Sequence, residues 1–438
     1  LSWENSWRIS SGPANWDAAW VFVKYRVSGG EWQHAWLSTT NGDHSLGNNN
    51  GVAATINIGT TEISTYDQGM GAFIFRSENG IGANNWQNIQ LRWNYGDNGV
   101  ADDATMDVQV FAIEMVYLPQ GAFTVGTGGT ETGSFTNGSW TSGATIALSI
   151  SSENALTIGQ SAGNLWGTSS SGNSTVGGSG TLEAYFPKGF AGFYCQKYEI
   201  TQQQYVDFLN TLTQTQANNR KYTGTGNRYT ITGSAVGSYA TTNPYVACNR
   251  LSWMDGCAYS DWAGLRPMTE LEYEKACRGS ATAVANEYAW GTASVANSAY
   301  TLSNAGATNE AIATNYNTTA GNASYTTTDG SVDGPLRVGI FAANTSNTGR
   351  TTAGASYYGI MELSGNLWER AVTVGNATGR AFTGVHGNGA LSTNGHADAT
   401  AWPGLSSGEV TGATGSGFRG GDWADNATDT RVSDRTHA

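Results

Sequence analysis

Apolar and polar residues alternate along the N-terminal part of the chain. Every second residue of 89–95 is apolar, and residues 106–112 repeat the pattern. A third apolar run, residues 19–27, is followed at once by Gly29 and Gly30, as expected where a strand turns into its neighbour. A period of two is typical of half-buried strands. About seven such strands at short spacing predict an all-β sandwich over residues 1–112.

Helical patterns begin only near residue 200, and each begins at a residue that can cap a helix. Thr201 with Gln204, and Thr269 with Glu272, have the spacing of capping boxes. Ser252 begins a third helical pattern. Beyond residue 279, short apolar pieces alternate with long loops rich in Gly and Asn. The pattern therefore predicts an α+β fold with much irregular structure over residues 113–438.

Residues 126–182 are dominated by Gly, Ser and Thr, a composition that usually indicates a linker. Residues 144–150 nevertheless have the character of a strand. We therefore interpret 126–182 as an insertion, a decorated loop or hairpin, within the second domain.

Composition narrows the classes of function. The 438 residues include 59 Gly, 16 Trp and 20 Tyr but only 13% charged residues, which argues against long helical bundles. No apolar run is long enough for a membrane span. The formal charge of −13 disfavours nucleic acid and anionic membranes as partners. A surface rich in Gly, Thr and Asn suits a secreted or cell-surface protein, and the chain begins at Leu1 without methionine, so either a leader was removed or the sequence is incomplete.

The four cysteines are Cys195, Cys248, Cys257 and Cys277. Their irregular spacing, without a Cys-x-x-Cys pair, disfavours a metal cluster. Disulfides and buried thiols both remain open.

Six segments carry a resemblance to a known family. They are residues 113–125, 193–201, 251–279, 288–291, 358–369 and 418–423. In this order they resemble the formylglycine-generating enzyme family, also called the sulfatase-modifying factors. The resemblance implies a C-type lectin-like α+β fold for residues 113–438.

The same resemblance implies an activity whose metal ligands this chain lacks. Enzymes of the family oxidise a cysteine to formylglycine with copper held by two cysteines, which follow a Gly-Gly-Ser-Trp-like strand. Here that strand is residues 419–423, and the two positions fall at about Asp425 and Thr430. A carboxylate and a hydroxyl cannot replace the soft thiolates that copper(I) requires. We therefore expect a protein that is not an enzyme.

The family also carries structural calcium, which implies two sets of oxygen ligands for Ca²⁺ in this chain. The first set is Asn304, Ala305, Asp329 and Ser331. The second set is Glu362, Gly365, Leu367 and Glu369. The alternative for the second set is that Glu369 pairs with Arg370 or with another arginine.

Some lectin-like relatives are not catalytic, and the chain is similar in this respect to the variable proteins of diversity-generating retroelements. In those proteins the stretch around the Gly-Gly-x-Trp strand contacts the ligand. Together with residues 372–390, the expected ligand-binding residues are Asp422, Asp425, Asn426, Thr428, Asp429, Thr430, Ser433 and Arg435. The family adds a Gly-Phe-Arg strand after this region, so we expect the domain to continue beyond Ala438.

The expected function is therefore binding or adhesion to an extracellular protein or glycan on a calcium-stabilised scaffold. One alternative is a structural subunit that self-assembles into a surface filament or sheath. A second alternative is a metal-dependent oxidase with a relocated metal site.

Overall fold

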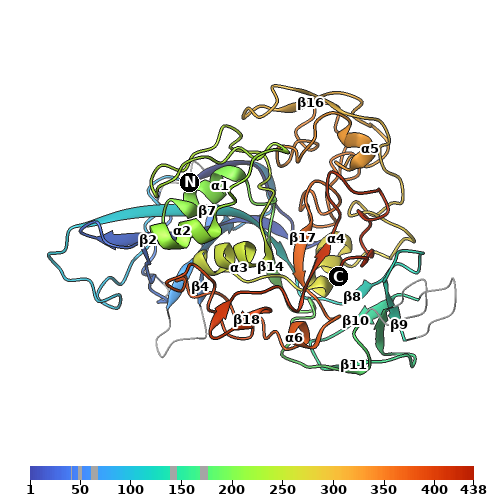
Figure 1. Ribbon diagram of the computed structural model, residues 1–438, viewed down its shortest axis with the longest axis horizontal. Helices are drawn as coiled ribbons and strands as arrows, with labels where there is room; N and C mark the ends of the chain where they lie inside the picture. The colour runs from blue at the N-terminus through green and yellow to red at the C-terminus, as the bar shows by residue number, and fades with distance from the viewer. Residues whose placement is uncertain (41, 48–51, 61–67, 139–145, 168–175) are drawn as a thin grey trace.

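The computed structural model describes residues 1–438 except 41, 48–51, 61–67, 139–145 and 168–175 (Figure 1). A long antiparallel pair of strands forms the centre of its N-terminal part. β2 (Trp16–Val27) pairs along its whole length with β7 (Met106–Leu118). The other strands of this eight-stranded sheet are β1 (Ser2–Arg8), β3 (Gln33–His34), β4 (Ala54–Thr60), β5 (Gly69–Arg76), β6 (Gly80–Asn85) and β14 (Phe193–Gln196).

Both faces of β2 are buried, because its alternate side chains enter two different hydrophobic clusters. Trp20 and Phe22 pack with residues of the first helices. Val21 and Val23 face the opposite side, where Trp86 and neighbouring residues cover them. The sheet is thus the central layer between a helical layer and a loop-rich layer.

The N-terminal region differs from the sandwich that the alternating pattern predicts. Residues 89–95 form only isolated bridges, at Gln90 and Trp93, so the prediction of a strand there is wrong. The alternation arises because Ile89, Leu91 and Trp93 turn inward from an irregular cover over β2. Among the described residues of 1–112, the strands belong to one sheet, so the expected sandwich is not confirmed.

The boundary that we placed between residues 112 and 113 falls inside β7. This strand pairs with β2 on one side and, from Met115 to Leu118, with β14 on the other. The two parts of the chain therefore share one sheet.

Four capped helices follow β14 (Figure 1). They are α1 (Gln202–Leu209), α2 (Gln214–Arg220), α3 (Trp253–Trp262) and α4 (Glu270–Arg278). Capping boxes at Thr201 and Thr269 are confirmed, and Ser252 caps α3 as expected. A further box, at Thr213, begins α2 and was missed, although Gln216 stands at the required spacing.

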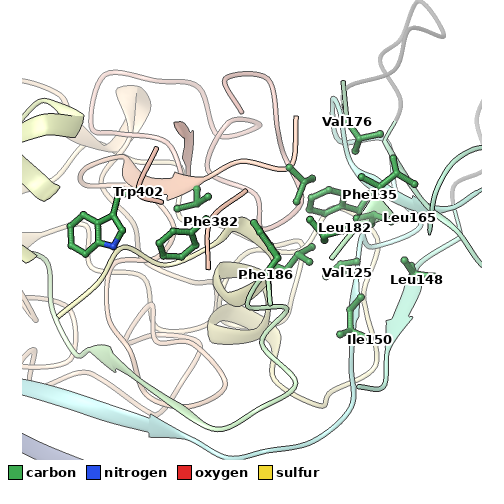
Figure 2. Packing of buried hydrophobic residues seen from close by; sticks show 14 of the residues in the cluster. Val125, Phe135, Leu148, Ile150, Leu165, Val176, Leu182, Phe186, Phe382 and Trp402 are labelled. Carbon is green, nitrogen blue, oxygen red and sulfur yellow. The ribbon is translucent and has the colours of Figure 1, made fainter. Parts of the chain in front are cut away.

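The Gly-, Ser- and Thr-rich insertion contributes strands and core residues. β8 (Phe123–Val125) pairs with β10 (Leu148–Ile150). A separate four-stranded sheet comprises β9 (Phe135–Asn137), β11 (Leu156–Ile158), β12 (Leu165–Gly167) and β13 (Gly180–Leu182). Its apolar side chains join a cluster with Phe382 and Trp402, so the insertion is packed against the rest of the second domain (Figure 2). Residues 144 and 145 of the predicted strand lie outside the described residues.

The remaining chain is mostly irregular, as expected. Its short elements are β15 (Thr301–Ser303), β16 (Ala311–Thr314), α5 (Thr326–Asp329), β17 (Glu369–Val372), α6 (Ala377–Arg380), β18 (Leu405–Ser406), β19 (Glu409–Val410) and β20 (Ser416–Arg419). With few helices, many strands and several small sheets, the fold is α+β. Over the described residues, no helix has the length and apolar character needed to cross a membrane.

Candidate functional site

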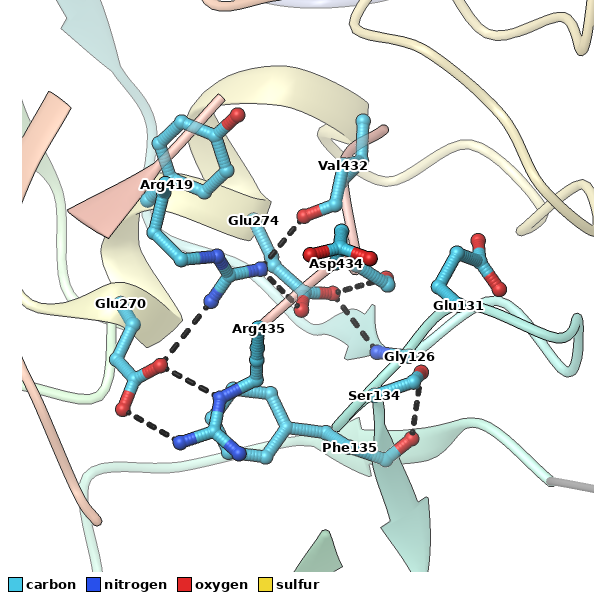
Figure 3. A network of polar contacts seen from close by, with 12 residues as sticks. Gly126, Glu131, Ser134, Phe135, Glu270, Glu274, Arg419, Val432, Asp434 and Arg435 are labelled. Atoms are coloured by element: carbon cyan, nitrogen blue, oxygen red, sulfur yellow. Dashed lines mark hydrogen bonds and ion pairs between the residues drawn. The ribbon is translucent and has the colours of Figure 1, made fainter. Parts of the chain in front are cut away.

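Two carboxylates of α4 fix the segment that follows β20. Glu270 and Glu274 are one helical turn apart, so their side chains leave the same face. Glu270 accepts hydrogen bonds from Arg435 at 2.6 and 2.9 Å and from Arg419 at 3.2 Å. Glu274 accepts one from Arg419 at 2.9 Å (Figure 3). Burial opposes ionisation of Glu270, but Arg435 and Arg419 lower its pKa to about 2.

Three expected ligand-binding residues lie inside the protein, two of them in this network. Arg435, Ser433 and Thr430 are all buried. Ser433 donates a hydrogen bond to Glu274 at 3.0 Å, and Thr430 donates one to the carbonyl oxygen of Ala427 at 3.0 Å. The expectation that these three side chains face a ligand is thereby corrected, since each is held by a partner inside the protein.

The other five expected ligand-binding residues retain contact with solvent. Asn426 and Thr428 are exposed, and Asp422, Asp425 and Asp429 are half-buried. The Asp425 carboxylate accepts a hydrogen bond from the backbone N–H of Asp422 at 3.0 Å. Burial and the neighbouring Asp425 raise the pKa of Asp422 to about 6. This half of the segment therefore presents a small acidic turn.

Residues 372–390, the other part of the expected surface, are anchored at both ends. Thr373 is buried and donates a hydrogen bond to Glu270 at 2.7 Å. The carbonyl oxygen of Gly389 accepts one from Lys24 of β2 at 2.6 Å. His386, between them, lines a cavity.

That cavity has a volume of about 740 Å³ and lies between the N-terminal sheet and the second domain. One side of its wall is apolar and includes Trp20, Phe73 and Met115 from β2, β5 and β7. Asp422 and Trp423 also belong to its wall, so it adjoins the acidic turn. A space of this size, mostly apolar with a few polar groups, can hold a small ligand.

Three thiols line the same cavity, those of Cys195, Cys248 and Cys257. All four cysteines of the chain are free, which decides between the disulfides and buried thiols that the sequence left open. Burial raises the pKa of Cys195 to about 12. Since the thiolate is the nucleophile and the metal ligand, these protonated thiols are poorly suited to either role.

Carboxylate oxygens without partners lie near the cavity. Oε2 of Glu362 and Oε2 of Glu369 are buried and accept no hydrogen bond from the part of the chain that the structure describes. The other oxygen of Glu362 accepts one from the N–H of Gly339 at 2.9 Å. A third carboxylate, Glu199, accepts one from the N–H of Leu367 at 2.8 Å.

The pKa values show how costly ionisation is at these positions. Burial raises the pKa of Glu362 to about 8. Burial, together with the negative charge of Glu199, raises the pKa of Glu369 well above its usual value. Arg370 instead donates to the carbonyl oxygen of Leu251 at 3.0 Å. In the described part of the chain, neither Glu362 nor Glu369 has an ion-pair partner, contrary to the alternative of a pair with arginine.

The second calcium set fits a hard cation. Besides the two unpaired carboxylate oxygens, the carbonyl oxygens of Gly365 and Leu367 accept no hydrogen bond from any described residue. Mixed carboxylate and carbonyl oxygens are what Ca²⁺ prefers. No group of three or more His, Cys, Asp or Glu side chains in the described ranges is placed to hold a metal ion. An ion here would therefore depend on main-chain oxygens as well.

The first calcium set does not fit in the same way. The Asp329 carboxylate already accepts a hydrogen bond from the N–H of Asp333 at 3.0 Å. Asn304, Ala305 and Ser331 are exposed. Among the described residues, neither Asn304 nor Asp329 has a side-chain oxygen that is both buried and unpaired, so the structure gives the two side chains of this set no support comparable with that for Glu362 and Glu369.

Comparison with known protein families assigns the chain to one of them. The family model described as the sulfatase-modifying factor enzyme 1-like domain matches residues 104–438. The chain belongs to this family. The match confirms the resemblance to formylglycine-generating enzymes, and it begins just before β7, which the family domain therefore includes. A search of curated proteins gives no match.

Sequence reasoning missed two features of this candidate site. Glu199 follows a mostly aromatic and apolar stretch and lies two residues before Thr201, the cap of α1, and this position was a usable signal for a buried carboxylate. The cavity had no such signal, because its lining comes from elements scattered over the whole chain.

The raised pKa of Glu362 predicts a pH dependence of stability. In EDTA, the unfolding free energy should fall as pH rises from about 5 to about 8, because the folded protein holds a proton that the unfolded chain releases near its usual pKa. Glu362→Gln should reduce this slope, measured by urea denaturation at a series of pH values. The exposed Glu78→Gln is the control and should leave the slope unchanged. Equal slopes for Glu362→Gln and the parent chain would contradict the assignment.

Proposed function

We propose that this chain is a non-catalytic member of its family that binds a ligand without transforming it. Support comes from the positions where the family holds copper. Asp425 is a carboxylate on the acidic turn, and the Thr430 hydroxyl is buried with its hydrogen bond directed to Ala427. No cysteine follows Cys277 in the sequence. Neither position offers the soft thiolate that copper(I) requires.

The cavity beside Asp422 carries the binding part of the proposal. It adjoins the acidic turn that replaces the copper site, and its inner wall is formed by Trp20, Phe73 and Met115. A ligand with an apolar body would fill the inner wall, and a polar end would lie near Asp422. Apolar burial would then supply most of the affinity and the few polar groups the orientation.

The proposed location of the protein is outside the cell. An exported or cell-surface protein that binds a protein or glycan, through a group that enters the cavity, agrees with the low content of charged residues. As part of this proposal, we predict that the second domain has a lectin-like arrangement and that the chain is similar to diversified variable proteins.

Calcium is the proposed structural cofactor, held by the second set. Glu362 and Glu369 would supply carboxylate oxygens, and Gly365 and Leu367 would supply carbonyl oxygens. A divalent cation would compensate the charges of two buried carboxylates that have no ion-pair partner among the described residues, and so would stabilise the turn between β17 and the preceding loop.

Filling the cavity tests the binding proposal. Gly256 lies in α3 and lines the cavity, and a Cβ at this position would meet no atom within 4 Å. Gly256→Trp can therefore begin a side chain in open space at the cavity wall, and it should weaken binding of the neutral dye Nile red by about tenfold or more. Fluorescence titration measures the effect.

Gly96→Trp is the matched control, since a Cβ there also meets open space and Gly96 does not line the cavity. It should bind the dye as the parent chain does. Failure of the parent chain to bind Nile red, or equal binding by Gly256→Trp, would refute the assignment of the cavity as the binding site.

Removing calcium tests the cofactor proposal. Chelation should lower the melting temperature, and Ca²⁺ at a hundredfold excess over its Kd should restore about 2–3 kcal/mol of stability. Glu369→Gln should lose this response, yet in EDTA it should be at least as stable as the parent chain, because the amide replaces a carboxyl group whose ionisation is opposed by burial. Asp329→Asn, in the first set, should keep the full response. A response that survives Glu369→Gln, or is abolished by Asp329→Asn, would overturn the proposal; differential scanning calorimetry decides.

A further inference from the structure

One edge of β7 is open along most of its length. β14 pairs with β7 only from Met115 to Leu118, and the last bond on this side runs from the N–H of Lys197 to the carbonyl oxygen of Glu114 at 2.9 Å. From residue 106 to residue 113 no strand among the described residues lies along this edge.

The direction of the backbone groups on β7 follows from two hydrogen bonds. The carbonyl oxygen of Thr105 accepts a bond from Ser28 next to β2, whereas that of Glu114 points to the β14 side. Because the N–H and C=O of a strand residue point to the same edge and successive residues alternate, the even-numbered residues face the open side. The backbone donors and acceptors of Val108, Val110 and Ala112 therefore have no partner strand among the residues that the structure describes.

The side chains of the same three residues border an apolar groove. The groove has a volume of about 750 Å³ and is lined by Val108, Val110 and Ala112 together with Trp86 and Leu91 of the loop-rich layer. Val108 is 49% exposed and Val110 is 65% exposed. An apolar edge next to an apolar groove is a surface that favours the addition of a strand.

Natural proteins usually protect such an edge with Lys, Pro or a bulge. Residues 106–113 contain neither Lys nor Pro, and their register with β2 is unbroken. The single charged side chain, Asp107, points to the opposite face from the groove and is paired with Arg26 at 2.7 Å. Nothing in this stretch opposes strand pairing.

We propose that this edge is an interface between two copies of the chain, in which β7 pairs antiparallel with β7 of a second copy. The two-fold axis lies at Val110. Val110 then faces its own counterpart, and Val108 faces Ala112, in hydrogen-bonded pairs that provide about six backbone bonds.

The side chains are self-complementary in this register. On the groove face the pairs Val110–Val110 and Val108–Ala112 are apolar, and on the other face Asp107 lies opposite Ile113, so that no like charges meet. The two grooves join into one apolar layer, and the large sheet continues from one copy into the other. The interface does not involve the cavity and is independent of the proposed ligand binding.

Charge substitution at the axis tests the interface. Analytical ultracentrifugation should show a concentration-dependent dimer for the parent chain. Val110→Lys should weaken dimerisation by about tenfold or more, because two ammonium groups would meet across the axis. Ile81→Lys is the matched control: Ile81 is 83% exposed on β6, away from the interface, and its substitution should leave dimerisation unchanged. Circular dichroism verifies that each variant is folded.

Mixing two variants tests the register itself. Val110→Glu alone should also weaken dimerisation, whereas an equal mixture of Val110→Lys and Val110→Glu should restore it, since only a residue that faces its own counterpart gives a lysine opposite a glutamate. A parent chain that remains monomeric at all concentrations, a Val110→Lys chain that dimerises normally, or a mixture that fails to restore dimerisation would each overturn the proposal.

Discussion

The buried ion-pair network on α4 is the interaction on which the second domain depends. Glu270 and Glu274 hold Arg419 at the end of β20 and Arg435 near the end of the chain, within hydrogen-bond distance and away from solvent. Removal of one partner from such a network leaves an uncompensated buried charge, which typically costs about 3–5 kcal/mol. The network therefore fixes β20 and the buried end of the segment after it, while the acidic turn around Asp425 stays at the surface.

A second group of buried carboxylates shows the opposite electrostatic situation. The pKa of Glu270 is about 2 because two arginines outweigh the effect of burial. The pKa of Glu362 is about 8, since burial there is opposed only by the Gly339 N–H and the more distant Arg337. Both carboxylates are buried, so their pKa values differ because two arginines compensate the charge of Glu270 and none pairs with Glu362 among the described residues. This contrast is the physical reason for placing a cation at Glu362 and Glu369 and not at the network of α4.

Local signals in the sequence predicted local structure well. Capping boxes at Thr201 and Thr269 predicted the starts of α1 and α4, because each box involves residues only three apart. The alternation in residues 89–95 led to the wrong prediction of a strand, because an irregular segment that packs against a sheet can also turn every second side chain inward. Thr430, Ser433 and Arg435 looked exposed because they are polar. The carboxylates that bury Arg435 and Ser433 are far away along the chain, and the cavity likewise arises only when distant elements meet.

The central claim is that this scaffold binds without oxidising, and oxygen consumption tests it most directly. The reduced protein would be loaded with copper(I) and supplied with a cysteine-containing peptide, and oxygen uptake would be followed together with conversion of the cysteine to formylglycine by mass spectrometry. With Asp425 and Thr430 at the thiolate positions, the account predicts uptake no faster than with copper and peptide alone, and no formylglycine. Protein-dependent oxygen uptake with formylglycine as product would contradict it.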